Sequence, residues 1–348
     1  MHSDLEIGLC DQHDLENLLD LAARLLTEQN RATIMNFLVW KYWSNPDCEN
    51  SLIVQARVRG RVVGMRGFMG QRWSIGAAGT ISIPLAGDTV IAREHEGRGL
   101  QRLMNRVAAH ECRRRSNLFM MNLSAGQTVN LQSRRAGWRL IAPTIELKRS
   151  PGLRSEGHRS FKTIRGAEPS GLTVTLDRVV SDDALRALVA AAPANRRPIA
   201  PVQNVEYWKW RLRCPISHYW FLTARARGDV LGIMVLARAW YYQDVIYAAH
   251  WLVRDDAIFC CLLKAAPEAF PDAEVVLWEN SLDASERECA KSLGFDKEAA
   301  PPGKQCPFKP GMLLVSTQDS PNDSYVCEGV DLLNGRNWQY YMLNSDAL

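Results

Sequence analysis

A short stretch that combines glycine, arginine and the start of a helical pattern is the part of the sequence best suited to chemistry. Residues 93–100 read Arg-Glu-His-Glu-Gly-Arg-Gly-Leu. Glycine lets backbone N–H groups approach a ligand closely, and a helix N-terminus adds unpaired donors and about half a positive charge. Arg98 adds a fixed cation between Gly97 and Gly99. These residue types in this order predict a site that holds a pyrophosphate.

The elements that must position this loop follow from the spacing of apolar residues. Helical spacing predicts amphipathic helices on both sides of the loop, and alternation predicts a hairpin that turns at Arg59-Gly60. The expected elements are, in chain order, helix 14–29, strands 51–57, 62–69, 78–84 and 87–92, helix 99–112, strand 117–123, helix 128–136 and strand 143–147. The loop therefore lies where the fourth strand meets the following helix.

The loop and this order of elements resemble the GNAT (Gcn5-related N-acetyltransferase) superfamily over residues 5–148. The resemblance implies that the loop binds the pyrophosphate of acetyl-CoA. The family's loop pattern is Arg/Gln-x-x-Gly-x-Gly/Ala, and this chain fits it at Gly99 only, with Glu96 and Gln101 at the other two positions. The resemblance implies as cofactor-binding residues Val90, Ile91, Ala92, Gly97, Arg98, Gly99, Leu100, Gln101 and Arg102.

The same resemblance implies a general base and a general acid. An amine is a nucleophile only when neutral, so its transfer reaction needs a base. The family's base is often a carboxylate on or beside the fourth strand, and we expect Asp88 to fill that role. The family's acid is commonly a tyrosine four residues before the glycine of the last helix, and here Ser133 stands four residues before Gly137. The alternatives that stay open are Glu94, Glu96 or the carboxylate of Leu348 as base, and Tyr340 or Tyr341 as acid.

The sequence also repeats itself at long range. The motif Trp-Lys-Tyr at 40–42 recurs as Trp-Lys-Trp at 208–210. The other matching segments are 55–60 with 223–228 and 62–64 with 230–232, all 168 residues apart, and 136–138 with 293–295, 157 residues apart. Matches in the same order predict two copies of one domain.

We therefore predict an α/β (α+β) chain with two tandem GNAT-like domains, each a mixed, mostly antiparallel sheet flanked by helices. The expected divisions are a first domain 1–148 that binds acetyl-CoA, a linker 149–171, a degenerate second domain 172–315 and a tail 316–348. The tail is expected to pack on the domains, because a disordered segment rarely holds so many aromatic residues.

The second copy departs from the first where the pyrophosphate would bind. Residues 254–256 read Arg-Asp-Asp, without glycine, and the carboxylates of Asp255 and Asp256 would repel a pyrophosphate. The second copy has also lost about a dozen residues. We expect the strand splaying that admits a pantetheine arm to be lost with them. The sequence thus predicts one acetyl-CoA per chain.

Composition excludes several classes of protein. The 42 Lys and Arg nearly balance the 38 Asp and Glu, which argues against nucleic-acid binding. No apolar run approaches the roughly 20 residues of a membrane span, and residues 1–16 do not resemble a secretory signal. The nine cysteines form no CxxC pair, which argues against a disulfide scaffold or a metal site and favours the cytoplasm. Cys260 and Cys261 are expected to be buried and inert.

The expected function is direct transfer of an acetyl group from acetyl-CoA to the amine of a small molecule or an amino sugar. The pair of copies resembles the tandem-GNAT proteins of bacteria. Two alternatives stay open: a CoA-binding or scaffold protein without turnover, because the base and acid positions are unusual, and a FemX-like transferase that uses aminoacyl-tRNA. The second alternative would be expected to lack the Gly-Arg-Gly loop. Assembly into a homodimer also stays open.

Overall fold

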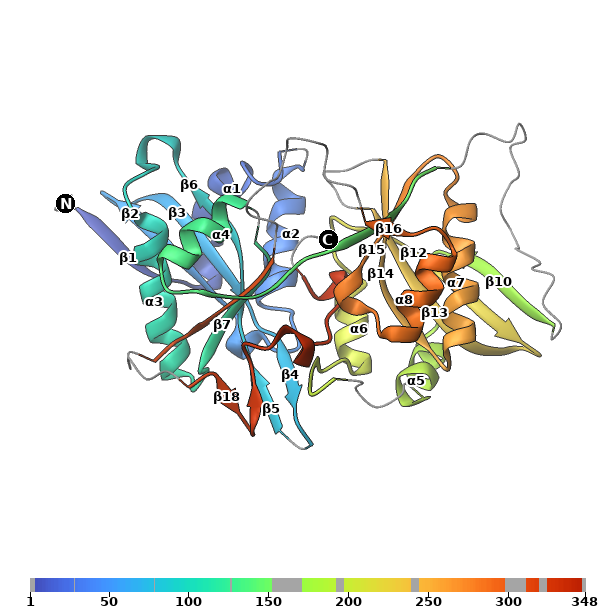
Figure 1. Ribbon diagram of the computed structural model, residues 1–348. Helices are drawn as coiled ribbons and strands as arrows, with labels where there is room; N and C mark the ends of the chain where they lie inside the picture. Colours follow the sequence, from blue (N-terminus) through green and yellow to red (C-terminus); the bar gives the residue numbers. More distant parts are fainter. Residues whose placement is uncertain are drawn as a thin grey trace, which may run out of the picture.

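The computed structural model describes residues 4–27, 29–77, 79–125, 127–151, 171–191, 197–238, 244–297, 311–318 and 324–345. Two sheet-rich halves lie side by side (Figure 1). The first is built mainly from the blue-to-green part of the chain and the second mainly from the yellow-to-orange part. Most of the predicted linker lies outside the described residues. The α/β class and the two-domain plan are confirmed.

Each half is built on a seven-stranded sheet. The first sheet has the order β1-β2-β3-β6-β7-β17-β8 and the second β10-β12-β13-β14-β15-β9-β16. The strands of the first are β1 (Leu5–Cys10), β2 (Leu52–Val58), β3 (Arg61–Met69), β6 (Leu85–Ile91), β7 (Phe119–Ala125), β17 (Gly311–Ser316) and β8 (Arg139–Pro143). Those of the second are β10 (Leu172–Asp177), β12 (His218–Ala226), β13 (Asp229–Arg238), β14 (Val245–Val253), β15 (Glu274–Trp278), β9 (Glu146–Arg149) and β16 (Asp296–Lys297).

Both sheets follow the same plan. Among the strands that the structure describes, one neighbouring pair in each sheet is parallel, β6 with β7 in the first and β14 with β15 in the second. All the other neighbours are antiparallel. Each half therefore has the mixed, mostly antiparallel sheet that the sequence predicts.

The two halves exchange one strand each. β9 follows six strands of the first sheet in the chain but pairs with β15 and β16 of the second sheet. β17 follows the second half but pairs with β7 and β8 of the first sheet. In Figure 1 the green strand crosses into the second half, and the red strand returns to the first. No single cut of the chain separates the sheets, so the ranges 1–148 and 172–315 do not coincide with them.

The strands alternate between two cores, one on each face of a sheet. In β2, Ile53 belongs to a central core, whereas Leu52 and Val54 pack with helix α3. In β13, Val235 belongs to the same central core, whereas Met234 packs with helix α7. The central core also holds residues of four other helices and of the C-terminal segment, so it joins the halves. The helices are α1 (Leu15–Ala22), α2 (Arg31–Tyr42), α3 (Leu100–Arg114), α4 (Gln127–Arg135), α5 (Asp182–Ala191), α6 (Val205–Arg211), α7 (Asp256–Ala269) and α8 (Ala284–Ser292).

The repeat seen in the sequence recurs in the backbone. The turn from β2 to β3 has φ angles of 50° at Arg59 and 77° at Gly60, and the turn from β12 to β13 has 51° at Arg227 and 91° at Gly228. Two successive positive φ angles are typical of the type I′ hairpin turn. The two copies thus use the same turn at the same position.

The structure differs from the expected elements, or adds to them, in three places. Residues 143–147 do not form one strand, because β8 ends at Pro143 and β9 begins at Glu146. Helix α2 and strand β1 have no counterpart among the expected elements. The residues missing from the second copy are those of a hairpin in the first, β4 (Arg72–Ile75) and β5 (Gly79–Ser82), which pairs with β11 (Ile199–Pro201).

Among the described residues, no helix is long and apolar enough to cross a membrane.

Candidate functional site

The loop between β6 and α3 has the geometry of an anion site. Gly97 and Gly99 have φ angles of 73° and 77°, a region that favours glycine. A Cβ atom at either position would meet nothing within 4 Å, so the backbone conformation rather than crowding calls for glycine. Gly99 is the N-cap of α3, and among the described residues no side chain caps this helix end. Within this part of the chain the first N–H groups of α3 therefore lack a side-chain acceptor, as a bound pyrophosphate requires.

Strand β6 separates from β7 before it reaches this loop. The two strands pair at Leu85 and Met121 only, and the Asn122 side chain donates to the carbonyl of Ala86, 3.1 Å away. Residues 87–91 form no ladder with β7 in the described part of the chain. The edge of β6 that carries the predicted residues Val90 and Ile91 is thus left for a ligand.

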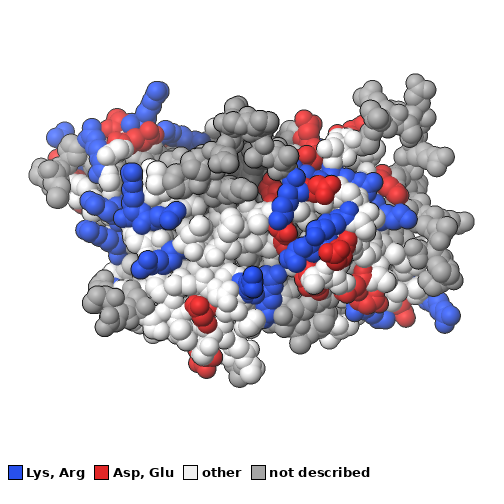
Figure 2. All heavy atoms as spheres, viewed as in Figure 1, with Lys and Arg blue, Asp and Glu red and all other residues white. Residues whose placement is uncertain are grey.

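Positive side chains gather near the loop. Figure 2 shows Lys and Arg side chains clustered over the first half on the side of α3, where Arg98, Arg102 and Arg106 are exposed. Glu96 is also exposed and lies 3.5 Å from Arg24. The pKa of Glu94 is lowered, chiefly by a hydrogen bond from its own backbone, which makes it a weaker base. The surroundings of the loop favour an anionic ligand.

Asp88 occupies a special position in β6. The pairing of β3 with β6 shifts register between Met65 and Gly67, so β6 carries an extra residue at this point, a β-bulge. Asp88 lies in the bulge and has a φ angle of 41°. A positive φ strains a residue other than glycine, and such strain is often held at functional sites.

Two buried donors bind the carboxylate of Asp88. The Nζ atom of Lys41 lies 2.8 Å from Oδ2, and the hydroxyl of Tyr42 donates to the same oxygen over 2.5 Å. The Lys41 side chain is 2% exposed and that of Asp88 14%. Sequence reasoning marked residues 40–42 as part of the repeat and placed Trp40 and Tyr42 in the core or the pocket wall, but it did not predict that Lys41 and Tyr42 contact Asp88. Their recurrence at 208–210 was the only signal, because contacts between distant residues leave no local pattern.

The acid candidates lie in two different places. Ser133 is on α4, is 2% exposed, and its hydroxyl has no hydrogen-bond partner among the described residues. The rings of Tyr340 and Trp278 lie 6.0 Å apart and those of Tyr341 and Trp251 4.9 Å apart, which places both tyrosines against the second sheet. Burial raises the pKa of Tyr340. Neither contact brings a tyrosine to the loop, so Ser133 remains the predicted acid, and Leu348 lies outside the described residues.

The N-terminus of α7, which corresponds to that of α3, is capped by a side chain of the chain itself. Asp255 is the N-cap of α7, and its carboxylate accepts from the backbone N–H of Ile258 at 2.9 Å. The hydroxyl of Ser285 on α8 donates to Asp256 at 2.6 Å. A chain carboxylate thus accepts a backbone N–H that a pyrophosphate oxygen would need, and the degenerate second copy stays a prediction.

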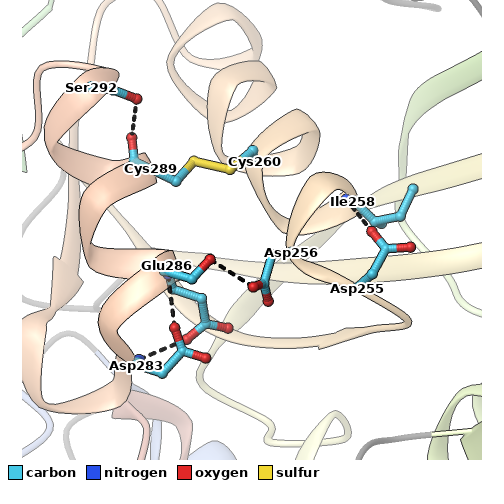
Figure 3. Close-up of a disulfide and its surroundings, with 9 residues drawn as sticks. Asp255, Asp256, Ile258, Cys260, Asp283, Glu286, Cys289 and Ser292 are labelled. Atoms are coloured by element: carbon cyan, nitrogen blue, oxygen red, sulfur yellow. Dashed lines mark hydrogen bonds between the residues drawn. A yellow bond between two sulfur atoms is a disulfide. The ribbon is translucent and has the colours of Figure 1, made fainter.

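A disulfide also links the two helices of this region. Cys260 of α7 is bonded to Cys289 of α8 (Figure 3). The expectation that Cys260 is an inert thiol is therefore wrong. The cause is tertiary: α7 and α8 pack together and bring two cysteines 29 residues apart within bonding distance.

The strand splaying expected to be lost in the second copy is still there. β14 and β15 pair from Val245 to Tyr247 only, although β14 runs to Val253. Tyr341 of the C-terminal segment stacks on the ring of His250 at 3.7 Å, beyond the paired part of β14. The segment that contacts β15 through Tyr340 thus fills the position between the separating strands with the chain's own side chains.

His250 gives a test of this packing. The side chain is 1% exposed, and burial lowers its pKa to about 3. An unfolded histidine has a pKa of about 6.5, so the unfolded state binds more protons below that pH and stability falls as pH is lowered from 6.5 toward 3. We expect the free energy of unfolding to fall by about 2 kcal/mol from pH 7 to 5 because of this residue. Urea unfolding at both pH values should show this extra loss in the wild type but not in His250→Phe; equal losses would contradict it.

Known proteins resemble this chain in structure rather than in sequence. No family model matches the sequence, and no curated protein matches it either. A conserved protein from Enterococcus faecalis V583, described as a probable N-acyltransferase, has a TM-score of 0.62 with 8% identity, over 90% of this chain and 73% of that one.

Two further solved structures span nearly the whole chain. A tandem GNAT protein from the clavulanic acid biosynthesis pathway has a TM-score of 0.58 with 13% identity, over 91% of this chain and 99% of that one. The N-myristoyltransferase of Saccharomyces cerevisiae, solved with myristoyl-CoA, has a TM-score of 0.58 with 11% identity, over 98% and 90%. Together with a sheet plan that occurs twice, this likeness shows that the chain has the same fold as the solved tandem GNAT protein.

Proposed function

We propose that this protein is an N-acyltransferase that moves an acetyl group from acetyl-CoA to the amine of a small molecule or an amino sugar. The observation that carries the proposal is the open N-terminus of α3 behind Gly97 and Gly99, at the end of the strand that holds Asp88. The tandem GNAT fold supports it. The proteins of similar structure include one described as a probable N-acyltransferase and one solved with an acyl-CoA.

In this proposal the first half supplies all the groups for the reaction. Backbone N–H groups of the loop and the guanidinium of Arg98 bind the pyrophosphate. Asp88 takes a proton from the ammonium group of the acceptor, and the neutral amine then attacks the thioester carbonyl carbon. The carbon–sulfur bond breaks, CoA leaves as a thiolate stabilised by the hydroxyl of Ser133, and a proton from the attacking nitrogen neutralises it. The residues act by binding, positioning and proton transfer.

A direct experiment separates an enzyme from a binding protein. Thermal shift with acetyl-CoA and with CoA tests whether the loop binds the nucleotide, and thiol release in the presence of an amino sugar, a polyamine and an amino acid tests transfer. We expect binding and amine-dependent thiol release. Binding without thiol release from any amine would favour the CoA-binding protein without turnover, and absence of binding would contradict the proposal.

Replacement of Arg98 tests the loop. Arg98→Ala removes one charge-assisted contact to the pyrophosphate, so we expect acetyl-CoA binding to weaken by about 1.5–3 kcal/mol in calorimetry. The matched control is Arg254→Ala, an exposed arginine just before α7 in the second half, which should bind acetyl-CoA as the wild type does. Unchanged affinity in Arg98→Ala would remove the loop from the proposed site.

We expect acetyl-CoA to bind to the first half of the chain and not to the second. The first offers an uncapped helix N-terminus, whereas Asp255 caps the corresponding helix of the second and α7 is bonded to α8. A buried or capping carboxylate at the phosphate position opposes an anionic ligand. We expect one acetyl-CoA per chain in equilibrium titration, and two per chain would overturn the assignment of the second half.

A further inference from the structure

We propose that Lys41 and Tyr42 are positioning residues that hold one oxygen of Asp88 so that the other oxygen accepts the proton of the acceptor amine. This inference rests on the proposed function and adds two residues to its machinery. It concerns the cluster of Lys41, Tyr42, Gly67 and Asp88, which lies where the end of α2 meets the bulge of β6.

The two donors share a single acceptor atom. Both Nζ of Lys41 and the hydroxyl of Tyr42 lie within hydrogen-bond distance of Oδ2 of Asp88, at 2.8 and 2.5 Å. Among the described residues no hydrogen bond reaches Oδ1. The Asp88 side chain keeps 14% of its surface exposed, whereas that of Lys41 keeps 2%. One oxygen is therefore fixed from the protein side, and the other is left for a ligand.

The fold makes room for this arrangement at a specific glycine. A Cβ atom at Gly67 would lie 1.8 Å from the hydroxyl of Tyr42, so any side chain at this position would displace that hydroxyl. Gly67 stands at the register shift that forms the bulge. The same residue thus permits the approach of Tyr42 and marks the bulge that holds Asp88 at a positive φ of 41°.

A buried lysine is costly to retain for stability alone. Burial of an ammonium group carries a large desolvation penalty, and apolar side chains of similar volume are often as stable as a buried ion pair. A buried lysine that contacts a strained carboxylate therefore points to a role in holding that carboxylate. Tyr42 shares this contact and is itself 2% exposed.

At the corresponding positions the second half keeps the lysine but none of the other three residues of the cluster. The positions that correspond to Lys41, Tyr42, Gly67 and Asp88 are Lys209, Trp210, Val235 and His250, counted from the repeat offset and from the pairing of Gly64 and Gly232 with the fourth strands. Lys209 pairs with Asp182 instead, 2.7 Å away. The cluster occurs only in the half with the open loop, as expected if it serves the reaction.

The proton step is simple. The acceptor enters as an ammonium, and one N–H bond breaks as a proton moves to Oδ1 of Asp88. The nitrogen lone pair then forms a bond to the acetyl carbon, the carbon–sulfur bond breaks, and the nitrogen passes its second proton to the leaving thiolate of CoA. Lys41 and Tyr42 keep their protons throughout, because they hold Oδ2 and give nothing to the substrate. Asp88 returns its proton to solvent after product leaves.

A double-mutant cycle tests whether the two residues act through Asp88. The single variants are Tyr42→Phe, which removes only the hydroxyl, and Asp88→Asn, and the double variant combines them. The assay is thiol release from acetyl-CoA with the amine of the panel that reacts fastest. We expect Tyr42→Phe to lower kcat about 10–100-fold, with unchanged acetyl-CoA affinity, and to have less than a twofold effect in the Asp88→Asn background. Lys41→Met should behave in the same way.

Controls separate positioning from a loss of structure. Tyr219→Phe removes the hydroxyl of another tyrosine that is largely buried (8% exposed), in the second half, and should leave kcat unchanged. If Tyr42→Phe lowered kcat by the same factor in the wild type and in the Asp88→Asn background, the inference would be overturned while the proposed function stands. A Tyr42→Phe enzyme with normal kcat would have the same consequence. A wild type that binds acetyl-CoA but releases no thiol would overturn the proposed function and this inference together.

Discussion

Replacement of Asp88 by asparagine is expected to lower kcat by about 10²–10⁴, as loss of a general base does. Asparagine keeps the shape of the side chain and an oxygen that can accept from Lys41 and Tyr42, but it takes up no proton at neutral pH. Because Asp88 lies in the bulge and not in the loop, acetyl-CoA affinity should stay within about twofold. Thiol-release assays measure kcat, and calorimetry measures the affinity for acetyl-CoA.

The control for this variant is a carboxylate at the rim of the same site. Glu96 is 57% exposed and pairs with Arg24, so Glu96→Gln should leave kcat within about twofold of the wild type. The double variant Asp88→Asn with Lys41→Met tests whether a buried lysine without its carboxylate disturbs the fold. Near-normal turnover in a folded Asp88→Asn enzyme would contradict its assignment as base and direct attention to Glu94 or Glu96.

Features set by neighbouring residues could be predicted from the sequence. The turn at Arg59-Gly60, the start of α3 after Gly99 and the turn after α4 at Gly137 all depend on a few adjacent residues and on positive φ angles, which glycine accepts. The repeat placed the same turns in the second half. These local signals were sufficient for the position of the loop and for most of the element order, but they missed β1 and α2.

Features set by contacts between distant residues could not be predicted. A strand pattern indicates an extended segment but not its neighbour, so the exchange of β9 and β17 left no trace in the sequence. The pairing of Cys260 with Cys289 is one of many that nine cysteines allow. In the site, Lys41 contacts Asp88 because α2 ends over the bulge. The spacing of residues in the sequence does not indicate this contact.

Arg211 is expected to stabilise the contact of the C-terminal segment with both halves of the chain. It ends α6, is 1% exposed, and donates to the carbonyls of Leu343 and Ser345 at 2.6 and 2.7 Å. Its guanidinium also lies 5.3 Å from the centre of the Trp40 ring. One side chain thus joins the second half, the C-terminal segment and α2 of the first half.

Replacement of Arg211 by methionine keeps much of the apolar volume but leaves two buried carbonyls without their donors. Each such loss costs about 1–3 kcal/mol, so we expect Arg211→Met to lower the free energy of unfolding by about 3–5 kcal/mol. Arg213, two residues further and exposed, is the matched control, and Arg213→Met should change stability by less than about 0.5 kcal/mol. Urea unfolding of both variants measures the difference. Similar values for the two would contradict this role of Arg211.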